Sequence, residues 1–130
     1  YKSDSMTPAY LMTSATVPKS QRISGIVIDA REHAVDPSMS PEVIDMQGNL
    51  VYGTISYSRS KAVNRGPVGY AYSMDDRNVS QRVGSNPLFV EAVGSLDDDV
   101  YITSMDAAKV REAEKSFGVL SNCRVMLLLQ

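Results

Sequence analysis

The sequence predicts an α+β domain with a mixed or mainly antiparallel sheet of about six strands and one well-formed helix packed on one face of that sheet. Three observations support this fold class. Short β-branched and apolar runs alternate with turn residues along most of the chain, only residues 104–117 carry a capped amphipathic helical pattern, and an unbroken apolar run follows that helix directly.

We expect two regions in the 130-residue chain. Residues 1–21 are rich in Ser, Thr and Pro, and we expect an irregular N-terminal arm or linker whose Leu11 and Met12 dock on the body. Residues 22–130 are expected to form a single α+β domain. A domain of this size buries about two-thirds of its unfolded surface and needs neither a metal nor a disulfide to fold.

In the first half, residues 22–30 are predicted to form a strand, and Pro37 and Pro41 break the connector that follows. Residues 42–45 and 49–52 flank a turn in which Gly48 is free to adopt positive φ, so a hairpin is expected. Residues 56–64 are predicted to form a short helix, ended by Gly66-Pro67.

In the second half, strands are predicted over residues 68–72, 87–93 and 100–103, with 75–85 as a loop or one helical turn and Asp97–Asp99 as a charged hairpin tip. The helix is expected to begin with Ser104 as its N-cap and to end at Gly118. Residues 124–129 form the last predicted strand. Its apolar run Val125–Leu129 indicates burial on both faces and hence a central position.

The bulk composition excludes several functions. The chain has 13 basic and 15 acidic side chains, and the basic residues form no stripe, so no nucleic-acid partner is expected. With one cysteine and one histidine, the chain can form no internal disulfide and is not expected to build a zinc site. No cofactor is expected. The apolar run Val125–Leu129 is too short to cross a bilayer. Because the sequence begins at Tyr1 rather than Met, an upstream leader or lipid anchor remains an open expectation.

Two charged groups follow the first strand. Asp29 and Arg31 project to the same face, where they can orient a ligand or partner group, although a structural ion pair is the favoured interpretation. Glu32, His33 and Asp36 surround the one imidazole and form a weak alternative site for a divalent metal or small ligand. A solvent-exposed loop histidine is the better interpretation of that group, and no metal site is expected.

The remaining candidates are tyrosines and a thiol. Tyr52, Tyr70 and Tyr72 lie on or beside predicted strands, as do Tyr57 and Tyr101, and such rings serve either the core or a protein interface. Cys123 precedes Arg124, a neighbour that can activate a thiol, but a buried structural cysteine is favoured over a hydrolase nucleophile. No phosphate-binding loop or nucleophile elbow is found, so we expect no enzyme.

Three segments carry a family resemblance. They are Gly25–Arg31 (GIVIDAR), Pro37–Asp45 (PSMSPEVID) with Val51-Tyr52-Gly53, and Asn86–Ala92 (NPLFVEA) followed by Asn122–Met126 (NCRVM). In this order they resemble a bacterial extracytoplasmic domain of lipoprotein-like proteins, some of them linked to flagellar outer-membrane lipoproteins of the FlgP type. The resemblance covers residues 22–130, and the chain departs from it in having Glu32 where the family has Gly.

The resemblance implies a cell-envelope location, in the periplasm or at the outer membrane, and a role in assembly through protein partners or self-association. It supplies no catalytic residues. From the residues themselves, we expect contacts through the Asp29–Arg31 strand end, its Pro-bounded loop and the exposed tyrosines. The alternative function is a small-ligand or metal-binding domain that uses the Glu32–His33–Asp36 loop.

Overall fold

The computed structural model describes residues 22–54, 56–57, 60, 62–63 and 66–130, and these contain eight strands in two four-stranded sheets. The α+β class is therefore confirmed, with more strands than the six expected. The N-terminal arm expected over residues 1–21 lies outside the described residues. Residues 58, 59, 61 and 64 of the short helix expected over 56–64 lie outside them as well, whereas Ser60, Ala62 and Val63 are described and helical.

The first sheet is entirely parallel. Its strands, in spatial order, are β4 (Gly69–Ala71), β8 (Val125–Leu128), β1 (Gly25–Asp29) and β5 (Pro87–Glu91). The central position predicted for the last strand is confirmed, because β8 lies between β4 and β1 and all four of its residues are buried. The expectation of a mainly antiparallel sheet is wrong here. The four strands are not consecutive in the chain, and each returns to the sheet through a long connection.

The second sheet is mixed, in the order β3 (Leu50–Tyr52), β2 (Val43–Asp45), β7 (Asp99–Ile102) and β6 (Gly94–Leu96). The predicted hairpin is confirmed as the antiparallel pair β2–β3, with Gly48 at a φ of 85°. The Asp45 carboxylate closes the turn, since its Oδ1 accepts hydrogen bonds from the main-chain N–H groups of Gln47 and Asn49, both at 2.9 Å.

The strand predicted over residues 87–93 passes from one sheet to the other. The main-chain N–H of Ala92 donates to Asp29 in the first sheet, whereas that of the next residue, Val93, donates to Tyr101 in the second. One continuous apolar run thus supplies β5 and then leads into β6. The change of sheet is a tertiary feature that a local apolar pattern does not reveal.

Two helices are described from end to end. Helix α2 (Arg77–Val83) replaces the loop or single turn expected over residues 75–85, and its N-cap Asp76 accepts a hydrogen bond from the N–H of Asn78. Helix α3 (Ser104–Phe117) ends at Gly118 as predicted, with a φ of 66° there, but its N-cap is Thr103 rather than Ser104. The Thr103 hydroxyl accepts the N–H of Asp106 at 3.1 Å.

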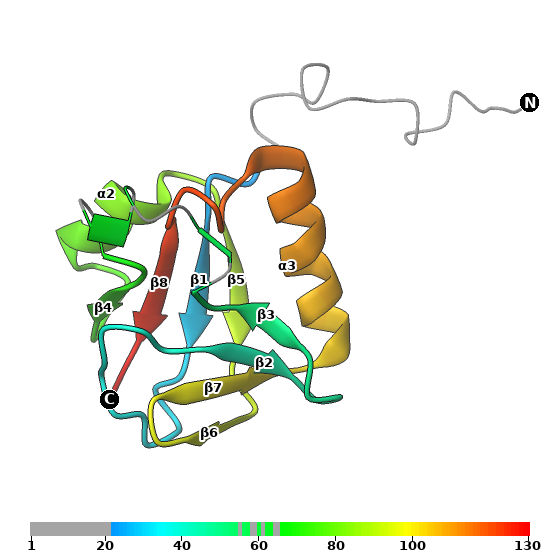
Figure 1. Ribbon diagram of the computed structural model, residues 1–130. Coiled ribbons are helices and arrows are strands. Elements are labelled where there is room, and N and C mark those ends of the chain that lie inside the picture. The colour runs from blue at the N-terminus through cyan, green and yellow to red at the C-terminus, as the bar shows by residue number, and fades with distance from the viewer. Residues whose placement is uncertain (1–21, 55, 58–59, 61, 64–65) are drawn as a thin grey trace, which may run out of the picture.

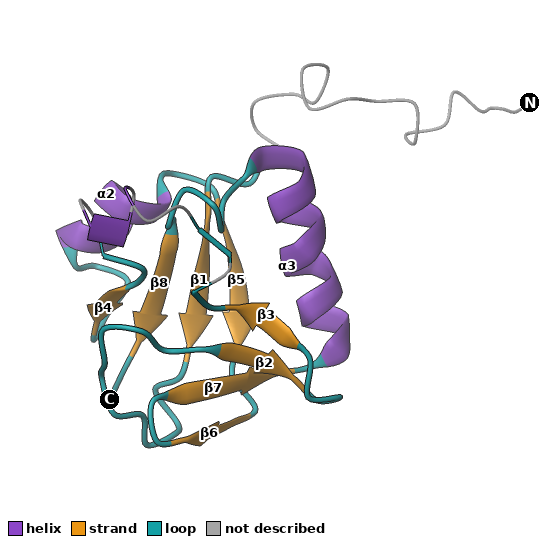
Figure 2. Cartoon of the chain, viewed as in Figure 1, coloured by secondary structure: helices purple, strands orange, loops and turns teal. Residues whose placement is uncertain are grey.

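The parallel sheet is the middle layer of the fold (Figure 1). Helix α2 covers one face, where Val27 and Met126 pack against Val79 and Val83. The second sheet and α3 cover the other face. The strands of the second sheet run across those of the first sheet in Figure 2. The larger core lies on that side. Alternation along β1 and β8 sends successive side chains to opposite layers, which explains why both strands are apolar throughout.

Candidate functional site

Asp29 and Arg31 form a two-pronged ion pair where β1 ends. Nε and Nη2 of Arg31 each lie 2.9 Å from a different oxygen of the Asp29 carboxylate, and the Arg31 main-chain N–H also donates to Oδ1. The hydrogen bond from the Arg31 side chain is the main cause of a lowered pKa at Asp29. The pair fixes the turn that follows β1. A role in contacting a partner or ligand stays a prediction.

The Glu32–His33–Asp36 loop is tied to its neighbours by hydrogen bonds that involve main-chain groups. Nε2 of His33 lies 3.1 Å from the carbonyl oxygen of Ala92, and the main-chain N–H of Asp36 donates to the carbonyl of Asp97. Within the described part of the chain, no group of three or more His, Cys, Asp or Glu side chains is arranged to hold a metal ion. The geometry therefore adds no support to the metal-binding alternative.

Tyr52 and Cys123 are core residues. Tyr52 is 1 % exposed, its hydroxyl donates to the carbonyl of Pro67, and its ring centroid lies 5.5 Å from that of Tyr57. Burial, with a smaller effect of the nearby Cys123, raises the pKa of Tyr52. Because β3 turns this ring inward, Tyr52 is not the surface contact that the sequence suggested. The Cys123 thiol is fully buried, as the structural interpretation of this cysteine expects.

Tyr70 holds the Pro-bounded loop, which we define as residues 37–41. Its hydroxyl accepts the main-chain N–H of Ser38 at 3.0 Å and donates to the Ser38 carbonyl at 2.7 Å. Burial is the main cause of a raised pKa at Tyr70. The Ser38 hydroxyl donates in turn to Asp98 at 2.6 Å. The loop is thereby fastened to both sheets, whereas Tyr72 is 70 % exposed.

An apolar pocket of about 640 Å³ opens beside this loop, a size within the usual range for binding pockets. Met39 and Val63 lie at its rim and are 86 % and 76 % exposed. An exposed methionine beside a mostly apolar concavity can adapt its shape to an inserted side chain. The pocket is lined by Met39, Ser40, Thr54, Tyr57, Ala62, Val63 and Pro67.

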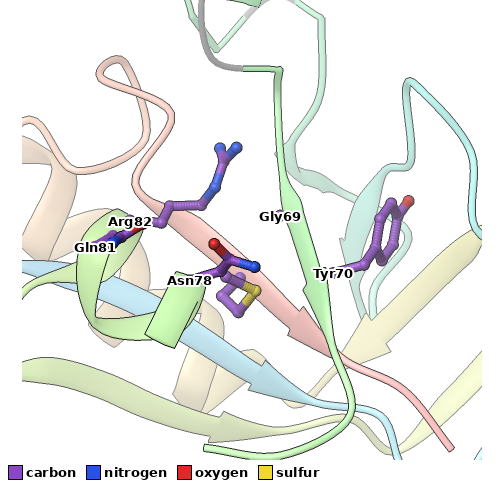
Figure 3. Close-up of a pocket in the computed structure, with 6 residues that line it drawn as sticks. Gly69, Tyr70, Asn78, Gln81 and Arg82 are labelled. Carbon is purple, nitrogen blue, oxygen red and sulfur yellow. The ribbon is translucent and has the colours of Figure 1, made fainter. Parts of the chain in front are cut away.

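A second, polar pocket of about 380 Å³ lies between α2 and β4 (Figure 3), with Asn78, Gln81 and Arg82 among its lining residues. Nη1 of Arg82 donates to the carbonyls of Gly66 and Cys123, at 3.1 and 2.9 Å. A Cβ at Gly69 would lie 2.6 Å from Nε of Arg82, so a glycine is needed for the guanidinium to pass. This arginine fastens the turn before β4 to the segment before β8, which gives it a structural role.

The sequence indicated part of the apolar pocket and missed the rest. It pointed to the Pro-bounded loop and to Tyr57, but not to Val63 or Pro67. Those residues meet only because the β2–β3 hairpin and β4 place the segment after β3 against the loop. The available signal was the pair of prolines around an exposed methionine. The polar pocket was missed because α2 itself was not predicted.

Together these features define a two-sheet α+β domain with an apolar surface pocket. None of the helices within the described residues has the length and hydrophobicity to cross a bilayer. A family model for the second domain of Treponema pallidum Tp0624 matches residues 25–130, and the chain belongs to that bacterial domain family. A search of curated proteins finds no match.

Proposed function

We propose that this domain is a non-enzymatic module of the bacterial cell envelope that acts by protein–protein contact, in an envelope or flagellum-associated assembly. The observation that carries the proposal is the apolar pocket beside the Pro-bounded loop. Its rim presents Met39 and Val63 to solvent, in a position where a partner can cover them.

The pocket suits a protein partner for two physical reasons. Burying an exposed methionine or valine side chain contributes roughly 1.5–3 kcal/mol, so Met39 and Val63 are strong candidates for the buried centre of an interface. The loop that carries Met39 is already held by Tyr70 and Asp98. A pre-ordered loop loses less conformational entropy on binding.

The envelope location rests on sequence. The segments Gly25–Arg31, Pro37–Asp45 and Asn86–Ala92 resemble domains of lipoprotein-like extracytoplasmic proteins, some of the FlgP type. Membership of a bacterial domain family is compatible with that location. Attachment through a lipid anchor upstream of this chain belongs to the same proposal. Fractionation of the native bacterium is its test: recovery in the envelope is expected, and recovery in the cytoplasm would refute the location.

Site-specific photocrosslinking tests the contact surface. A photoreactive amino acid replaces Met39 in the full-length protein, and Met105 serves as the matched control because it is also an exposed methionine, 72 % accessible, on α3. We expect a discrete adduct with an envelope protein from position 39, lost on Val63→Glu, and none from position 105. No adduct from position 39, or equal adducts from both positions, would overturn the proposed surface.

A further inference from the structure

Strand β5 forms one edge of the parallel sheet. Among the strands of the described residues, it pairs with β1 alone. The main-chain N–H of Ala92 donates to the carbonyl of Asp29, so the even-numbered residues along this segment face β1. Because main-chain groups alternate in direction along a strand, Pro87, Phe89 and Glu91 direct theirs outward. This outer edge is seen beside α3 in Figure 2.

Apolar side chains flank the edge on both faces of the sheet. On the α3 face, Ile23, Leu88 and Phe117 are among the residues that line a groove of about 270 Å³ between β5 and the helix. On the α2 face, Phe89 is 45 % exposed and lies in register with Val27 of β1. A strand edge with apolar flanks favours pairing with a further strand.

The outward main-chain groups of β5 match those of a second copy of β5. Pro87 lacks an N–H, so the donors that point outward are those of Phe89 and Glu91. In an antiparallel pair that aligns β5 with its counterpart over its whole length, Phe89 lies opposite Phe89 and Glu91 lies opposite Pro87. Each Phe89 N–H then donates to the opposite Phe89 carbonyl, and each Glu91 N–H donates to a Pro87 carbonyl. Every outward donor of the strand is thereby paired.

The two ends of β5 also differ in charge. At the amino end, Arg22 and Arg124 line one pocket. At the carboxyl end, Glu32 and Glu91 lie together, beside the Asp29–Arg31 ion pair. Antiparallel pairing of two copies brings the basic end of one strand to the acidic end of the other, whereas parallel pairing would oppose like charges.

We propose that this domain forms a two-fold symmetric homodimer in which the β5 strands of two copies pair antiparallel about Phe89 and join their parallel sheets into one. The two Phe89 rings then meet across the axis on the α2 face, and an aromatic pair is more stable than its buried area alone implies. On the α3 face, the two grooves adjoin. Because both copies use the same edge, the pairing stops at two chains. No residue of β5 lines the apolar pocket, so this inference is independent of that pocket and of the envelope proposal.

The mass of the full 130-residue chain tests the dimer when it is measured by light scattering from about 1 μM to about 1 mM. We expect the mass to rise with concentration from that of one chain to that of two. Phe89→Lys places a charge at the axis and should weaken association at least about tenfold. Tyr72→Lys is the matched control, because Tyr72 is 70 % exposed and follows β4 at the opposite edge of the same sheet, and it should leave the dimer unchanged.

Reversal of charge tests the antiparallel direction. Glu91→Arg places a positive charge against the basic end of the second copy, and Arg22→Glu places a negative charge against its acidic end. Each change should weaken association by about tenfold, and the double variant should restore most of the native affinity. A double variant that associates as weakly as the single variants would overturn the antiparallel pairing.

Amide exchange by NMR locates the contact. Exchange at Phe89 and Glu91 should slow as the concentration rises, while exchange at Val27, in the middle of the sheet, stays constant and shows that the fold is intact. Met39→Glu should dimerise like the native chain, which separates this inference from the apolar pocket. A chain that stays monomeric throughout the series, or a dimer that Phe89→Lys leaves intact, would overturn the proposal.

Discussion

Removal of the Tyr70 hydroxyl should release the Pro-bounded loop. In Tyr70→Phe, the main-chain N–H and C=O of Ser38 both lose their partner, at donor–acceptor distances of 3.0 and 2.7 Å in the native protein. Each hydrogen bond is worth about 1 kcal/mol net, and the half-buried Ser38 can recover part of this from water. We therefore expect a loss of about 1–2 kcal/mol, or roughly 4–8 °C in Tm.

Urea and thermal unfolding, followed by circular dichroism, measure the effect, and the amide exchange of Ser38 reports the loop itself. Tyr72→Phe is the matched control, because Tyr72 is 70 % exposed and should change stability by less than about 0.5 kcal/mol. Ser38 exchange should become faster in Tyr70→Phe only. Equal stability of the two variants, with unchanged exchange at Ser38, would refute the idea that Tyr70 holds the loop.

Three further predictions concern the scaffold. Leu127→Asp should abolish cooperative unfolding, because a carboxylate at a fully buried position of β8 costs several kcal/mol, whereas Leu127→Met should cost less than about 1.5 kcal/mol. The pKa of the Asp45 carboxyl is lowered, mainly because the carboxylate accepts a hydrogen bond from the main-chain N–H of Asn49. The ionised carboxylate therefore stabilises the fold fully at pH values above the ordinary pKa of an aspartate. This stabilisation is lost as the pH falls through the lowered pKa of the folded state. Asp45→Asn should thus be less stable than the native protein at pH 7 and about equally stable in acid, as measured by the urea midpoint of unfolding at a series of pH values. A difference in midpoint that stays constant with pH would contradict this. Gly25→Ala should cost about 1–3 kcal/mol in chemical denaturation, since the new Cβ would lie 2.6 Å from Val83, while Gly94→Ala, whose nearest contact is 4.0 Å away, should be nearly neutral.

The sequence predicted elements whose signal is local. The hairpin around Gly48, the stop of α3 at Gly118 and the buried run of β8 depend on turn chemistry, capping and unbroken apolarity, and all three are present in the structure. Helix α2 was missed because it is mostly polar and buries only Val79 and Val83. A helix with so few buried positions has almost no apolar periodicity to detect.

Pairing between distant strands could not be predicted in this way. Nothing in residues 25–29 indicates that they pair in parallel with residues 87–91 and 125–128, although continuous burial of β8 was a clue to a parallel sheet. The same limit applies to the candidate site. The Pro-bounded loop was visible in the sequence, but the wall formed by Val63 and Pro67 depends on how the segment after β3 packs.

The size of the native complex tests most directly the claim that this domain works through its apolar pocket. The full-length protein is extracted from native envelopes in mild detergent as wild type, Met39→Glu and Met105→Glu, and its complexes are sized by light scattering. We predict one defined assembly for the wild type and for Met105→Glu, and release of the Met39→Glu protein from it. A wild-type protein that is recovered alone, or a Met39→Glu protein that stays in the assembly, would contradict the proposed function.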